Sequence, residues 1–80
     1  MEGIFVETQL AQVKLNVPTQ VLYIKEDGDF QKRLRDFGLV PGTEVVCRYR
    51  SPGGFVTALE FRDTVIALRK SDLKKIQVEC

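Results

Sequence analysis

The 80-residue chain has no histidine, no tryptophan and only two cysteines, Cys47 and Cys80. Two thiols far apart in the sequence make no disulfide framework. A structural zinc site takes about four cysteine or histidine ligands, which this chain cannot supply. Nucleophilic catalysis commonly needs a base such as histidine beside the nucleophile. The composition therefore predicts no metal site, no cofactor and no catalytic residue, with Cys47 as a small buried hydrophobic residue.

The chain also lacks a long apolar run and an excess of one charge. No segment approaches the roughly 20 apolar residues that span a bilayer. The start, MEGIFVETQL, has no basic segment of the kind that opens a signal peptide. We therefore expect a cytoplasmic protein with no direct membrane insertion. Twelve basic and eleven acidic residues give a net charge of +1, a balance that argues against nucleic acid as the main partner.

The chain does contain short β-branched and aromatic segments separated by turn residues. Thr8 is expected to cap a helical turn over 8–13, followed by a turn at Asn16. The segment TQVLYIK is apolar on both faces and predicts a strand buried on both sides. A second helical turn is expected over 71–75, capped by Ser71 or Asp72. The expected strands are 19–25, 43–50, 55–62, 64–69 and 76–78.

Alternation of apolar and polar residues indicates which side chains of these strands face inward. SPGG and Asp63 mark the turns between them. About five short strands with closely spaced turns and one helix favour a small, partly closed β-barrel. The positions expected to face inward are Val45, Cys47, Tyr49, Thr57, Leu59, Phe61, Ile66 and Leu68.

One longer helix is predicted over 29–37. Asp29 is a good N-cap, and Phe30, Leu34 and Phe37 recur at helical spacing on one side. Lys32, Arg33 and Arg35 lie outside this apolar stripe.

The helix is followed by a sharp change of direction. Gly38 stands where a helix-ending residue takes a left-handed conformation, and Leu39 would fold back on the helix. Pro41 and Gly42 suit the central positions of a type II turn. Gly38, Pro41 and Gly42 are therefore interpreted as structural turn residues that connect a helix to a strand.

With these residues in place, the chain resembles the FeoA family of bacterial ferrous iron transport. The resemblance rests on KRLRDFGLVPGTEV and on LEFRDTVIALRKSDLKKIQV. The chain departs from the family pattern at Asn16 and Asp63, where members usually have glycine. The resemblance implies a single SH3-like domain over 1–80, mainly β, with one inserted α-helix. It further implies a non-enzymatic accessory protein that binds the membrane GTPase-transporter FeoB.

Two other interpretations stay open at this stage. The chain could be the C-terminal SH3-like domain of a metal-dependent transcriptional repressor, although Met1 just before the first turn favours a free-standing protein. It could also be a small nucleic-acid-binding barrel, which would need exposed aromatic residues on a basic groove. The oligomeric state is not predicted.

We place the expected partner surface on the helix and the turn that follows it. The stripe of apolar residues continues into Leu39 and Val40, which is more than a short helix needs to pack on a thin barrel. An apolar centre with a charged rim is typical of interaction surfaces. The alternative is that the whole stripe belongs to the core, and the open barrel side near Val46, Phe55 and Val56 is the next candidate. The residues expected nearest the partner are Arg33, Leu34, Phe37 and Leu39.

Overall fold

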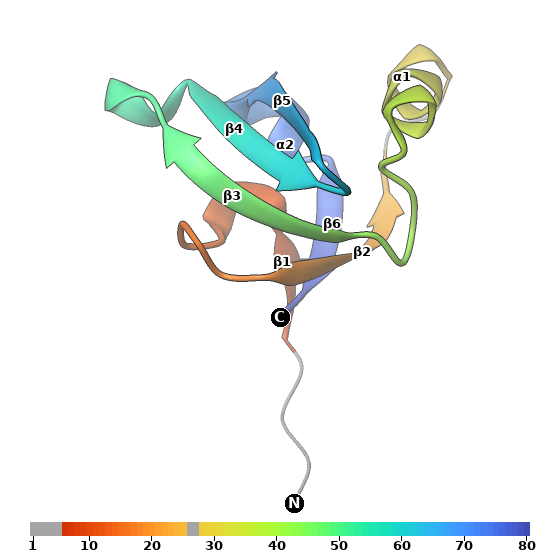
Figure 1. Ribbon diagram of the computed structural model, residues 1–80, viewed down its shortest axis with the longest axis horizontal. Helices are drawn as coiled ribbons and strands as arrows, with labels where there is room; N and C mark the ends of the chain where they lie inside the picture. Colours follow the sequence, from red (N-terminus) through yellow and green to blue (C-terminus); the bar gives the residue numbers. More distant parts are fainter. Residues whose placement is uncertain (1–5, 26–27) are drawn as a thin grey trace, which may run out of the picture.

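The computed structural model describes residues 6–25 and 28–80. Over these residues six strands form one antiparallel sheet, in the order β1-β6-β2-β3-β4-β5, that curls into a partly open barrel (Figure 1). The mainly β barrel with one inserted helix is as predicted. The strands are β1 (Glu7–Gln9), β2 (Thr19–Ile24), β3 (Glu44–Arg50), β4 (Val56–Phe61), β5 (Thr64–Arg69) and β6 (Ile76–Glu79). The helical elements are η1 (Leu10–Gln12), α1 (Asp29–Phe37), η2 (Pro52–Gly54) and α2 (Lys70–Leu73).

The strand β1 was not predicted, and it replaces the start of the expected helical turn over 8–13. Thr8 lies opposite Val78 of β6 instead of capping a helix, and its hydroxyl contacts Gln12 Oε1 at 2.9 Å. Thr8 and Val78 are 70 residues apart in the sequence. Pairing over such a separation depends on the fold and leaves no pattern in the residues around Thr8. The turn itself exists as η1, and Leu10 and Val13 are buried.

The expectation that β2 is buried on both faces was wrong. Thr19 and Val21 are buried, whereas Gln20 and Tyr23 are exposed. The sheet is a single curved layer, so the outer face of a strand meets solvent even where its side chain is apolar. Asn16, which precedes this strand, has φ 65°, as its turn-forming role predicted.

In β3 the predicted alternation holds at Val45 and Cys47 and then fails. The register shifts between Cys47 and Tyr49, and such a bulge moves the following side chains to the opposite faces. Tyr49 is therefore 57% exposed. Arg50 turns partly inward, where Nη2 donates to the carbonyl of Val13 at 2.8 Å.

The predicted helix caps were also wrong in detail. Gly28, with φ 63°, precedes α1, and Asp29 is its first residue, with no side-chain cap hydrogen bond. The helix α2 begins at Lys70, so Ser71 and Asp72 lie inside it. The Asp72 carboxylate lies 3.7 Å from Arg69 Nε. The bounds of α1 are as predicted.

The core fills the barrel between β2, β3, β4 and β6 and includes the buried thiol of Cys47. The inward positions predicted for β4 are all buried, and in β5 Leu68 is buried while Ile66 is partly buried. No helix among the described residues is long and apolar enough to cross a membrane. The buried hydrophobic residues are Leu10, Val13, Val21, Phe30, Leu34, Leu39, Val45, Cys47, Leu59, Phe61, Leu68, Leu73, Ile76 and Val78.

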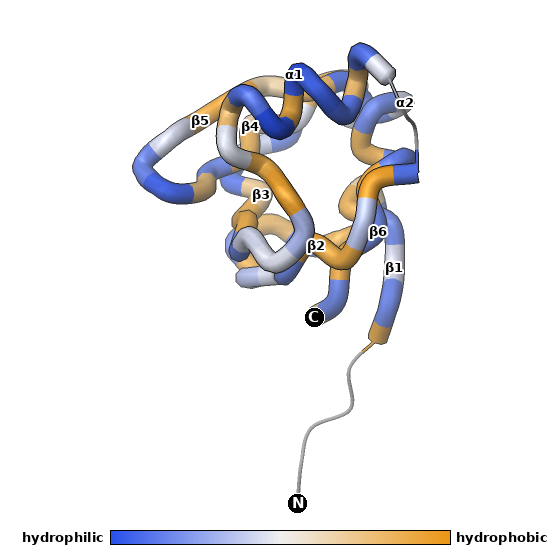
Figure 2. The backbone as a smooth tube through the Cα atoms, turned by 90° about the vertical axis from the view of Figure 1, so that its right-hand side faces the viewer, coloured by the Kyte–Doolittle hydropathy of each residue, from blue (hydrophilic) through white to orange (hydrophobic). Residues whose placement is uncertain are grey.

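The helix α1 lies outside the barrel, next to β5 (Figures 1 and 2). Figure 2 shows it as mostly hydrophilic with hydrophobic residues at intervals. This placement leaves the outer side of α1 exposed to solvent, close to one edge of the sheet.

Candidate functional site

The helix α1 is fixed to the barrel at its start. The ammonium of Lys75 lies 5.0 Å from the ring centroid of Phe30, a distance at which a cation is attracted to the face of an aromatic ring. Gln31 Nε2 donates to the carbonyl of Ile24 at 2.8 Å. These contacts join the helix to β2 and to the segment that leads into β6. A surface on α1 therefore has a defined position relative to the barrel.

The end of α1 is fixed by the turn residues that the sequence indicated. Gly38 has φ 98°, and its N–H donates to the carbonyl of Arg35 at 2.9 Å. The N–H of Leu39 donates to the carbonyl of Leu34 at 2.8 Å. These two bonds form a Schellman cap, and the left-handed Gly38 closes it.

The Pro41-Gly42 turn follows this cap and is as predicted. Gly42 has φ 93°, and the N–H of Thr43 donates to the carbonyl of Val40 at 3.0 Å. The turn is tied to β2, because the N–H of Gly42 donates to Val21 at 2.7 Å and the N–H of Val21 donates to Thr43 at 2.9 Å.

Thr43 is a residue whose role the sequence interpretation missed. It is buried, and its hydroxyl donates to the carbonyl of Gly38 at 3.3 Å while accepting from the N–H of Val40 at 3.2 Å. Thr43 thereby joins the cap to the turn. A threonine directly after Pro-Gly was the available signal.

Of the four residues expected nearest a partner, the structure leaves two at the surface. Leu34 and Leu39 have no exposed area, so the expectation that they contact a partner was wrong for both. Their side chains fill the space between α1 and the barrel, as the core interpretation of the stripe proposed. Phe37 is 52% exposed and Arg33 is exposed. The apolar stripe is thus divided between the core and the surface.

The two exposed residues line a groove between α1 and β5. Its volume is about 510 Å³. Phe37 is its apolar wall on the helix side, and the inner side chains of β5 form the opposite wall. The lining residues are Arg33, Asp36, Phe37, Ile66, Ala67 and Leu68.

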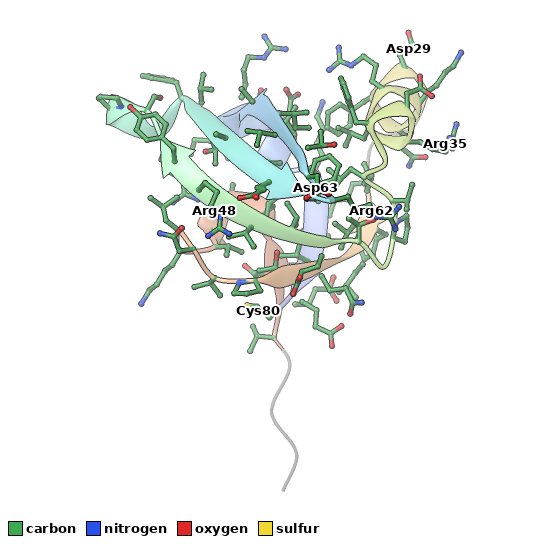
Figure 3. The ribbon with its side chains drawn as sticks, in the orientation of Figure 1. Asp29, Arg35, Arg48, Arg62, Asp63 and Cys80 are labelled. Carbon is green, nitrogen blue, oxygen red and sulfur yellow. The ribbon has the colours of Figure 1, made fainter. Side chains whose placement is uncertain are left out.

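A second, smaller groove of about 170 Å³ lies on the other side of α1, against β2. Its lining includes Arg35 and Tyr23. Arg33 and Arg35 therefore belong to different surfaces, although only one residue separates them. Figure 3 shows Arg35 on α1 and Arg62 with Asp63 at the tip of the β4–β5 hairpin.

The open barrel side that the sequence offered as the next candidate also carries exposed apolar residues. Phe55 is 72% exposed and Val56 is exposed, and the bulge in β3 adds Tyr49 to the outer surface. Glu60 on the same sheet accepts a hydrogen bond from Arg48 Nε at 2.7 Å, which neutralises charge on this face.

The titratable residues that line the grooves are Arg33 and Asp36 in the larger one and Tyr23 and Arg35 in the smaller one. Burial raises the pKa of the Cys47 thiol, which keeps it in the unreactive protonated form. In the ranges 6–25 and 28–80, no group of three or more histidine, cysteine, aspartate or glutamate residues is arranged to hold a metal ion. The outer side of α1 presents the guanidinium of Arg33 and the ring of Phe37 to solvent.

Comparison with known proteins connects this arrangement to one family. The sequence model of the FeoA domain matches residues 8–80. No curated protein matches the chain. The solved structure of an FeoA-like protein from Clostridium acetobutylicum is 30% identical, with a TM-score of 0.80 over 90% of this chain and 84% of that chain.

Two further structures show the same fold. FeoA of Stenotrophomonas maltophilia complexed with zinc, a prokaryotic SH3 domain protein, is 28% identical, with a TM-score of 0.78 over 89% of this chain and 88% of that one. ScaR with bound Cd²⁺ is 19% identical, with a TM-score of 0.81 over 91% of this chain and 35% of that chain. The barrel is therefore SH3-like, as the resemblance to the FeoA family implied.

Proposed function

Because the chain belongs to the FeoA domain family, a family of non-catalytic accessory proteins of ferrous iron transport, we propose that it acts by binding a FeoB-type membrane GTPase-transporter. Binding takes place at the cytoplasmic side of the membrane, in line with the expected cytoplasmic location. The single observation that carries this proposal is the family match over residues 8–80, which covers almost the whole chain. That residues 1–80 form a single domain remains a prediction.

The surface around α1 supports a binding role. Phe37 and Arg33 present an apolar group and a charge side by side beside a groove, and both ends of the helix are fixed to the barrel. A preorganised surface loses little conformational freedom on binding. Arg33 and Phe37 are therefore the proposed partner contacts, with Gly38, Pro41 and Gly42 holding the helix in place.

A pull-down with the full-length transporter of the same organism, solubilised in mild detergent, tests the proposal. The immobilised 80-residue protein is expected to retain the transporter at low salt, and a resin carrying an unrelated SH3-like domain is the control. Equal retention by both resins would contradict the proposal.

A second function is favoured by one observation, the likeness in fold to a manganese-dependent transcriptional repressor, with a TM-score of 0.80. The chain covers 40% of that protein, so it could correspond to the SH3-like part of a metal-dependent repressor. The two proposals differ in genomic context. A DNA-binding region upstream in the same reading frame would favour the repressor, and a neighbouring transporter gene would favour the accessory protein.

A further inference from the structure

The strand β5 lies at one edge of the sheet. It pairs with β4 on one side, and no other strand among the described residues pairs with it. The two strands are joined by Arg62 and Asp63, both at positive φ, which is the geometry of a tight two-residue hairpin. The opposite side of β5 is adjacent to the groove that α1 borders.

The pairing of β5 with β4 determines which backbone groups point toward this free edge. In an antiparallel pair, opposite residues alternate between pairs that exchange hydrogen bonds and pairs that do not. Just beyond β5, the N–H of Lys70 donates to the carbonyl of Phe55 at 2.9 Å. Counting back from Lys70 in the register of β4 and β5, every second residue of β5 bonds to β4. Val65, Ala67 and Arg69 lie between these residues and do not bond to β4.

The N–H and C=O groups of these three residues therefore point away from β4. Arg69 is the N-cap of α2, so its carbonyl accepts the first bond of that helix. Apart from that carbonyl, no backbone hydrogen bond joins these groups to another element within the part of the chain that the structure describes. A row of such groups is a template on which another extended chain can pair. A strand added here would continue the ladder at the spacing of the existing sheet.

The groove fits an added strand because it lies directly beside this edge. Ile66 and Leu68 form its wall on β5, and Phe37 faces them from α1. Its volume of about 510 Å³ is in the range of pockets that bind ligands. Side chains alternate along a strand, so every second residue of the added strand would meet this apolar lining. An edge strand beside such a groove is a known way for domains to bind extended peptides.

Charges around the groove indicate the kind of segment that fits. Arg33 borders it on the helix side, and Arg69 and Lys70 lie exposed at the end of β5. Asp36 is the one acidic residue that lines it, and Asp72 is buried beside Arg69. Basic groups thus outnumber exposed acidic groups, which favours an acidic ligand.

We propose that the free edge of β5 binds an extended segment of the transporter as an additional strand. The segment has apolar residues at alternate positions, facing Phe37 and Ile66, and an acidic residue beside Arg33. This inference rests on the proposed function, since it describes how the transporter docks. It differs from docking on α1 alone, because the backbone of β5 supplies the main contacts.

Amide hydrogen exchange, read by NMR after the complex is dissociated, tests the backbone pairing. With the transporter bound, the amides of Val65, Ala67 and Arg69 are expected to exchange at least about tenfold more slowly. The amides of Thr64, Ile66 and Leu68 already bond to β4 and should change little. This alternating pattern distinguishes an added strand from general covering of the surface.

A proline variant tests the same contact in the pull-down. Ala67→Pro removes an N–H that points to the free edge and leaves the bonds to β4 in place, so transporter retention should fall by at least about tenfold.

Gln9→Pro is the matched control on β1, the other edge strand. Gln9 already has φ −77°, a value that proline adopts, and retention should not change. Melting curves report whether both variants fold. If Ala67→Pro does not fold, the hydrogen-exchange pattern of the unaltered protein alone decides whether a strand is added to β5.

The possible outcomes separate this inference from the proposed function. Retention of the transporter with unchanged β5 amides overturns the added strand and leaves the proposed function standing. Failure to retain the transporter overturns both. Alternating protection that grows with protein concentration in the absence of the transporter shows that a second copy occupies the edge, which also overturns the inference.

Discussion

The N–H of Leu39 donates to the carbonyl of Leu34 at 2.8 Å, across the left-handed Gly38. Both leucines are fully buried. The bond joins the last turn of α1 to the segment that leads into β3, and the two side chains pack under the helix. The position of Arg33 and Phe37 relative to β5 therefore depends on the conformation of Gly38.

The first prediction concerns the two turn glycines. Gly38→Val and Gly42→Val should each lower the free energy of unfolding by about 1–3 kcal/mol, because φ is 98° and 93° at these positions and a β-branched residue is strained there. A Cβ at Gly42 would meet nothing within 4 Å, so backbone strain is the expected cause. Urea unfolding measures the loss.

Gly38→Asn is the control and should lower the free energy of unfolding by less than Gly38→Val, since asparagine adopts positive φ more readily. Unchanged melting temperatures for both valine variants would show that the turns tolerate any residue.

The cap and the turn could be predicted because their chemistry is local. Glycine at Gly38, and proline followed by glycine at Pro41 and Gly42, are the residue types that these backbone conformations need. The same logic located the positive φ of Asn16 and Asp63. Each of these conformations depends on a few neighbouring residues, and the sequence displays them directly.

The features that were missed depend on distant parts of the chain. β1 exists because Thr8 pairs with Val78, and Tyr49 faces outward because of a bulge opposite β4. At the candidate site, helical spacing placed Leu34 and Phe37 on one stripe but could not show where the barrel surface ends. The groove beside β5 requires knowledge of which strand lies at the edge of the sheet, and the hydropathy pattern does not contain this information.

The second prediction compares Arg33 with Arg35. Arg33→Glu should weaken binding to the transporter at low salt, because Arg33 borders the groove beside β5 and reversal of a rim charge slows association. Arg35→Glu is the control, since Arg35 lines the other groove. The effect of Arg33→Glu should diminish as salt screens the charge. Equal retention of both variants in a low-salt pull-down would exclude the Arg33 surface as the contact.

The third prediction concerns the two thiols. Cys47 has no exposed area and burial raises the pKa of its thiol, so it should resist alkylation in the folded protein. Cys80 is exposed and should react rapidly. Mass spectrometry after a short treatment with iodoacetamide at neutral pH should show one modification, located at Cys80. Two modifications at equal rates would show that the core opens readily, and a urea-unfolded sample is the control for full labelling.

The fourth prediction is that the isolated protein neither binds Fe²⁺ tightly nor hydrolyses GTP. The chain has no histidine, and Cys47 is buried in the core. The sequence also has no glycine-rich phosphate-binding loop of the Walker type. Anaerobic calorimetry should detect no Fe²⁺ binding with a dissociation constant below about 1 μM. Sub-micromolar binding would contradict the prediction, and a Cys80→Ser variant would then show whether the terminal thiol is a ligand.

The last prediction concerns Glu7, which links β1 to its neighbours. Its carboxylate accepts hydrogen bonds from Gln77 Nε2 at 3.1 Å and from the Tyr23 hydroxyl at 2.9 Å. These bonds lower the pKa of Glu7 in the folded protein. A lowered pKa stabilises the folded protein at pH values above about 4.3, the ordinary pKa of glutamate. This stability is lost as the pH falls through the lowered pKa of the folded protein.

Glu7→Gln should therefore destabilise the protein at pH 7 and have progressively less effect as the pH is lowered below about 4. Urea unfolding of both proteins over this pH range gives the difference in unfolding free energy. Glu44→Gln is the matched control, because no hydrogen bond or ion pair of the Glu44 carboxylate is found in the described part of the chain. Many carboxylates contribute to the pH dependence of the whole protein, so the comparison between variants carries the result. A difference for Glu7→Gln that stays constant from pH 7 to pH 3 would show that the charge of Glu7 does not hold β1 in place.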